Sequence, residues 1–126
     1  MEYKEMKRKI IQKIKEEKWL PVIEVERLFE KNEYDYKGDY NLYTNFPDGT
    51  MNESVVIWKG WTKEATTMIC EILEESNRKI AFKPAFNPIE LFCLGGGFIN
   101  MPIAEDMNKK YKKQHWLPGA YVWLGK

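Results

Sequence analysis

In the first part of the chain, apolar residues recur every three or four positions among residues that are mostly charged. This spacing predicts an amphipathic helix over residues 3–18, because side chains three and four apart lie on one face of a helix. Pro21 ends this helix, since proline cannot continue it, and it suits the first turn of a second helix over residues 22–31. The positions expected to face inward are Met6, Ile10, Ile11 and Ile14, then Val22, Val25, Leu28 and Phe29.

The pattern then changes to that of strands. Residues 40–46 are rich in aromatic side chains and lead into the turn sequence Pro47-Asp48-Gly49. Residues 54–58 form a short β-branched run. Together these segments predict a β-hairpin over residues 40–58. In its first strand, Tyr40, Leu42 and Thr44 are expected on one face.

A third helix is predicted over residues 63–76. The Thr62 hydroxyl can cap its first turn, Glu64 suits the positive end of the helix dipole, and Asn77 suits a left-handed stop. The stripe expected to be buried consists of Ala65, Met68, Ile69, Ile72 and Leu73.

The last third of the chain reads as strands and loops. Residues 79–85 and 89–94 are predicted strands, joined across Asn87-Pro88. Residues 105–113 are basic and form a short helix or a loop, and the apolar tail from Trp116 to Leu124 is expected to dock on the body as a strand or extended arm.

The amino-acid composition indicates the general class of protein. The chain has 126 residues, 44% hydrophobic and 14% aromatic, which predicts one ordered α+β domain over residues 1–126. Its net charge of +1 gives no overall attraction to nucleic acid or membrane. The sequence shows no secretory leader and no run of transmembrane length, so a cytoplasmic location and no membrane partner are expected.

Taken together, the order of elements resembles that of the winged-helix superfamily, in which two or three helices precede a two-stranded wing. The matching parts are the helices at 3–18, 22–31 and 63–76, followed by the strands at 79–85 and 89–94. The chain departs from the family by a β-hairpin inserted between the second and third helices. The resemblance implies DNA binding. The stretch from Tyr111 to Pro118 also resembles the ending of small uncharacterised phage and plasmid proteins.

No motif in the sequence favours catalysis, so we expect no enzyme activity, no cofactor and no metal. His115 is the only histidine and has no nucleophile or carboxylate motif around it. Gly95-Gly96-Gly97 matches neither the P-loop nor the dinucleotide fingerprint and is interpreted as a turn or bulge. Cys70 and Cys93 lack the spacing of a zinc or redox motif and are expected to be buried, without a disulfide.

Two basic clusters are the features that favour a polyanionic partner. One lies on the first helix, and the other is the run from Lys109 to Lys113 beside His115 and Trp116. As a winged-helix-like module, the chain would place helix 63–76 in the major groove and use the wing for further contacts. The predicted nucleic-acid-binding residues are Lys63, Thr66, Thr67, Arg78, Lys79, Lys83, Lys109, Lys110, Lys112 and Lys113.

A protein partner is the alternative hypothesis. The chain would then be an inhibitor or adaptor encoded by a phage or plasmid, and it would not contact nucleic acid. Aromatic residues would serve as interface anchors, since such side chains dominate protein–protein binding energy. These candidates are Tyr34, Tyr36, Tyr40, Tyr43, Trp58 and Trp61. The sequence leaves the oligomeric state open.

Overall fold

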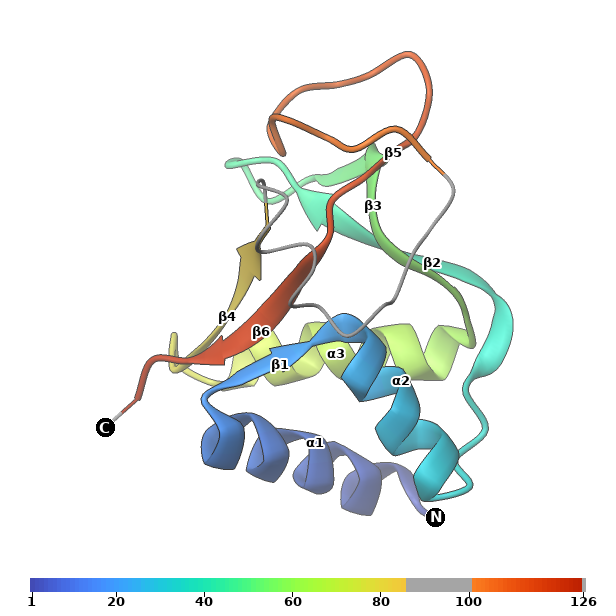
Figure 1. The fold of residues 1–126 in the computed structure, drawn as a ribbon, viewed down its shortest axis with the longest axis vertical. Coiled ribbons are helices and arrows are strands. Elements are labelled where there is room, and N and C mark those ends of the chain that lie inside the picture. Colours follow the sequence, from blue (N-terminus) through green and yellow to red (C-terminus); the bar gives the residue numbers. More distant parts are fainter. Residues whose placement is uncertain (86–100, 126) are drawn as a thin grey trace.

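The computed structural model describes residues 1–85 and 101–125, which form an α+β fold of three helices and two small sheets (Figure 1). The first sheet has the strand order β1-β6-β4 and the second has the order β2-β3-β5. The predicted strand 89–94, Gly95-Gly96-Gly97 and Cys93 lie outside the described residues. None of the helices in the described ranges is long and apolar enough to cross a membrane.

The first two helices form where the apolar periodicity predicts them. α1 (Tyr3–Glu17) buries Met6, Ile10 and Ile14, and it ends at Lys18, whose φ of 68° turns the chain away. The backbone N–H of Lys18 donates to the carbonyl of Ile14 at 2.8 Å, which satisfies one of the last free carbonyl groups of the helix. α2 (Val22–Lys31) buries Val22, Val25 and Phe29.

Between these helices the chain forms a short strand that the sequence did not predict. β1 (Trp19–Pro21) pairs antiparallel with β6 (Gly119–Trp123), and β6 pairs antiparallel with β4 (Ile80–Pro84) on its other side. The tail therefore docks as the central strand of a sheet, as predicted for the segment after Trp116. Among the described residues, β4 pairs with β6. The two strands are more than thirty residues apart in the chain, so they are not joined by a short hairpin turn.

The predicted hairpin is confirmed. β2 (Lys37–Asn45) pairs with β3 (Met51–Trp61), with several register shifts that mark bulges. Leu42 and Thr44 are buried as expected, whereas Tyr40 is 50% exposed because the register shifts on either side of it. β5 (His115–Trp116) adds to β3 in parallel.

The third helix, α3 (Lys63–Glu75), is also confirmed with its cap. The Thr62 hydroxyl accepts a hydrogen bond from the backbone N–H of Ala65 at 3.0 Å. Asn77 and Arg78 take the left-handed φ values of 54° and 65° that end the helix. The expectation that Cys70 is buried is wrong: it lies at the boundary of the buried stripe of α3 and is exposed.

The main core joins all three helices to both sheets. Phe29 on α2 meets Trp61 on β3 edge to face, with ring centroids 5.2 Å apart. The Glu26 carboxylate accepts hydrogen bonds from the indole N–H groups of Trp58 and Trp61 at 3.1 and 3.0 Å. These contacts give both indole N–H groups a hydrogen-bond acceptor and hold α2 against the hairpin.

Candidate nucleic-acid interface

The structure distributes the ten predicted binding residues over three regions. Lys63, Thr66 and Thr67 belong to α3, Arg78, Lys79 and Lys83 follow it into β4, and the remaining four lysines lie on a loop near β5. In Figure 1 this loop projects at the opposite end of the molecule from α1. The ten residues therefore do not form one continuous surface.

On α3, Lys63 and Thr67 are exposed as predicted, but Thr66 is not. Thr66 is 9% exposed, and its hydroxyl donates to the carbonyl of Lys63 at 2.8 Å. A threonine hydroxyl that bonds back to its own helix is not available to a base edge. The prediction that Thr66 faces outward is wrong, because residue 66 lies on the same side as the buried Ala65 and Ile69.

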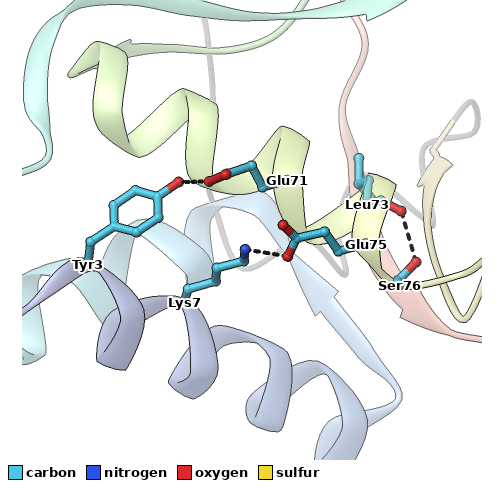
Figure 2. A network of polar contacts seen from close by, with 6 residues as sticks. All are labelled: Tyr3, Lys7, Glu71, Leu73, Glu75 and Ser76. Atoms are coloured by element: carbon cyan, nitrogen blue, oxygen red, sulfur yellow. Dashed lines mark hydrogen bonds and ion pairs between the residues drawn. The ribbon is translucent and has the colours of Figure 1, made fainter.

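The acidic side of α3 is engaged by α1 (Figure 2). The Tyr3 hydroxyl donates to the Glu71 carboxylate, and Lys7 forms an ion pair with Glu75 one turn further along both helices. Burial, with the Glu71 hydrogen bond second, raises the pKa of Tyr3 above its usual range. Glu64 and Glu74 also remain exposed, and Lys63 is the only basic residue of α3, so the helix presents a net negative charge to a phosphate backbone.

Arg78, Lys79 and Lys83 are all exposed where α3 passes into β4. The backbone carbonyl of Lys79 accepts a hydrogen bond from Leu124, which ties this corner to the C-terminal strand. The three side chains lie on the first sheet and its approach, separate from the third basic region.

The third region is a loop of residues 104–114, here called the lysine loop. Two backbone hydrogen bonds of 2.8 Å close its base, from Ala104 to Trp116 and from Trp116 to Pro102. Four exposed lysines lie in the second half of the loop, and none of them forms an ion pair with a described residue. These lysines are Lys109, Lys110, Lys112 and Lys113.

Side chains of β3 hold the lysine loop from beneath. The amide of Asn52, which is 1% exposed, donates to the carbonyls of Met107 and Lys109, each at 3.0 Å. The Ser54 hydroxyl accepts the backbone N–H of Tyr111 at 3.0 Å. A buried amide that satisfies two loop carbonyls restricts the backbone between them.

Tyr111 organises the interior of the loop. Its ring stacks on His115 with a centroid separation of 3.8 Å, and the Lys109 ammonium lies 5.1 Å from the ring centroid. Its hydroxyl accepts the backbone N–H groups of Glu105 and Asp106 at 3.2 and 3.1 Å. His115 Nδ1 lies 2.9 Å from the carbonyl of Lys113, so Nδ1 is the protonated nitrogen.

The loop itself contains two carboxylates, and a third, the exposed Glu53, lies on β3 between Asn52 and Ser54. Asp106 accepts the backbone N–H of Asn108 at 2.9 Å, and Glu105 is exposed at the entry to the loop. The four lysines therefore exceed the acidic groups of the loop. A rigid segment with excess positive charge matches a phosphate backbone, because contacts made without ordering the chain lose less conformational entropy.

A hollow of about 380 Å³ elsewhere in the molecule has the opposite charge. It lies between α2 and β2, where Glu30, Glu33 and Asp35 surround Tyr34 and Tyr36. Burial, followed by the nearby Glu64 carboxylate, raises the pKa of Tyr34 to about 12. Within the described ranges, no group of three or more His, Cys, Asp or Glu side chains is arranged to hold a metal ion.

Comparison of the chain with protein-family models, with curated proteins and with solved structures found no match.

Sequence reasoning found the four lysines but missed the residues that position them. Asn52 and Ser54 precede the Val-Val-Ile-Trp run and read as hairpin residues. Their partners lie more than fifty residues further along the chain. No local pattern in the sequence signals a contact of that separation.

Proposed function

We propose that this chain is a non-catalytic nucleic-acid-binding module that contacts the DNA backbone through the lysine loop. The observation that carries the proposal is the geometry of that loop: its backbone is held by Asn52, and its four lysines form no ion pair with any residue in the described part of the chain. Phosphate contacts of this kind provide affinity without sequence readout.

The order of elements supports a winged-helix-like module, and the resemblance of the stretch from Tyr111 to Pro118 to small phage and plasmid proteins adds a phage or mobile-element type. A helix, a short strand, a second helix, the inserted hairpin and a third helix precede β4, and β6 returns beside β4. In this arrangement the lysine loop belongs to the connection between β4 and β6, where a wing would lie. A cytoplasmic location is part of the proposal, because such a module meets its DNA there.

The proposal gives α3 a secondary role. Its outer side carries Glu64 and Glu74 beside Lys63, and Glu71 and Glu75 contact α1. Like charges facing a phosphate backbone oppose binding. We therefore assign the main contacts to the lysine loop and only supporting contacts to Lys63 and Thr67.

The experiment compares two variants that lose the same amount of positive charge. One changes the four lysines of the loop to Ala, and the other changes Lys4, Arg8, Lys9 and Lys31, which are exposed on α1 and α2. Binding of random-sequence duplex DNA is measured at about 50 mM salt. We expect the loop variant to lose far more affinity than the helix variant.

Equal loss in both variants would show a general charge effect and contradict a specific role for the loop. A larger loss in the helix variant would assign the footprint to α1. Absence of DNA binding by the unaltered chain would reject the proposal and favour the protein-binding inhibitor or adaptor. In that case the exposed Tyr40 and the acidic hollow become the surfaces to test.

A further inference from the structure

The first sheet has one face buried and one face partly exposed. The strand register places Trp19, Val122 and Ala81 directly opposite one another. Residues opposite each other in antiparallel strands project from the same face, and every second residue along a strand returns to it. The outer face defined in this way carries Trp19, Ala81, Val122, Leu124, Lys79 and Lys83. It also carries Pro21 and Ala120 beside Lys83, which are buried, so the accessible part lies around Trp19 and Leu124.

The residues on the two faces of this sheet differ in how exposed they are. Leu20, Tyr121 and Ile80 alternate with the outer-face residues and belong to the main core. On the outer face, Trp19 is 37% exposed and Leu124 is 61% exposed. The other tryptophans are buried or half-buried, so Trp19 is the most accessible indole among the described residues.

Positive side chains border this face along β4. Lys79 and Lys83 lie along β4 and are exposed. Lys18, which precedes Trp19 in the chain, is also exposed. The Lys15 ammonium, in contrast, lies 5.6 Å from the ring of Trp123, which belongs to the opposite face of the sheet. The neighbouring Glu16 and Glu17 are engaged, respectively, by Gln12 at 2.8 Å and by Lys13 at 3.1 Å.

From this juxtaposition we infer that the outer face binds single-stranded nucleic acid, with Trp19 stacking on a base and the bordering lysines contacting phosphates. An exposed indole offers a flat surface that accepts any base, and flanking lysines follow the backbone. The partner is a single strand because a duplex hides the faces of its bases. The inference shares the class of partner with the proposed function but uses a separate surface.

The test uses a labelled oligothymidylate and the full chain. Affinity is measured for the unaltered protein, for Trp19→Leu, and for Tyr40→Leu, which removes a more exposed aromatic ring from the second sheet. We expect Trp19→Leu to weaken single-strand binding by about 5- to 150-fold. We expect Tyr40→Leu to leave it unchanged, and the oligonucleotide to quench indole fluorescence in every variant except Trp19→Leu.

The other possible results of these binding measurements each contradict one or both proposals. Equal affinity of Trp19→Leu and the unaltered chain overturns this inference and leaves the lysine-loop proposal standing. If the lysine-loop variant keeps full affinity for duplex DNA while Trp19→Leu loses the single strand, the proposed function fails and this inference stands. Quenching by phosphatidylserine vesicles but not by the oligonucleotide overturns it in favour of a lipid surface, and absence of any binding overturns both proposals.

Discussion

The buried side-chain amide of Asn52 donates a 3.0 Å hydrogen bond to the backbone carbonyl of Lys109, 57 residues away. The same amide also holds the carbonyl of Met107 at 3.0 Å. Through these bonds, β3 sets the conformation of the segment that carries four exposed lysines. The lysine loop is in this respect part of the folded body rather than a loose basic tail.

Changing Asn52 to Ala is expected to release the lysine loop. The change leaves the carbonyls of Met107 and Lys109 without their partner, and removal of such a buried group costs about 1–3 kcal/mol. Trypsin, which cleaves after lysine, should cut the variant between residues 109 and 113 faster than the unaltered chain. Mass spectrometry of a digestion time course measures this directly.

Asn45→Ala is the matched control, because Asn45 is exposed at the other side of the hairpin turn. It should leave the digestion pattern unchanged. Equal cleavage rates in the loop for Asn52→Ala and the unaltered chain would contradict the assigned role of Asn52.

Ile72 tests the packing of α3. It is 2% exposed, and Ile72→Ala is expected to lower the free energy of unfolding by about 2–5 kcal/mol, because truncation leaves a cavity in the core. Thr67→Ala, on the exposed side of the same helix, should change it by no more than about 0.5 kcal/mol. Urea unfolding of both variants measures the difference, and similar midpoints would contradict the packing.

Alkaline pH should destabilise the fold through Tyr34. Burial and Glu64 raise its folded-state pKa to about 12, above the value of about 10 expected in the unfolded chain. The resulting stability is fully present below pH of about 10 and is lost as the pH rises toward 12, because the unfolded state releases the proton first.

Tyr34→Phe should therefore flatten the decline of stability between about pH 10 and 12. The change removes the interaction of this buried hydroxyl with the Glu64 carboxylate, so it should cost about 1–2 kcal/mol at neutral pH. Tyr40→Phe, at an exposed position, is the control. An unchanged pH profile for Tyr34→Phe would contradict the assignment.

Local patterns in the sequence were sufficient for the helices and the hairpin. The spacing of Met6, Ile10 and Ile14 and the cap at Thr62 reflect interactions within a few residues, so they can be read without the tertiary structure. The Pro47-Asp48-Gly49 turn likewise predicted the connection of β2 and β3.

Pairings between distant segments could not be read in this way. β1 has three residues and ends in proline, and it becomes a strand only because β6 returns beside it from the C-terminus. The exposure of Thr66 and Cys70 could not be predicted for a similar reason. It depends on which side of α3 packs against α1 and β2, and helical spacing alone does not decide whether a residue at the boundary of the buried stripe is buried, as Thr66 is, or exposed, as Cys70 is.

If the lysine loop binds phosphates, DNA binding must weaken steeply as the salt concentration rises, and the four loop lysines must account for most of that dependence. The measurement is the Kd for random-sequence duplex DNA between about 50 and 200 mM salt, for the unaltered chain and for the variant with all four loop lysines changed to Ala. Each phosphate contact contributes about 0.9 to the slope of log affinity against log salt. The account predicts a steep slope for the unaltered chain and a slope smaller by about 3 to 4 for the variant, with its fold confirmed by circular dichroism. Equal slopes for the two proteins, or no binding at the lowest salt, would contradict it.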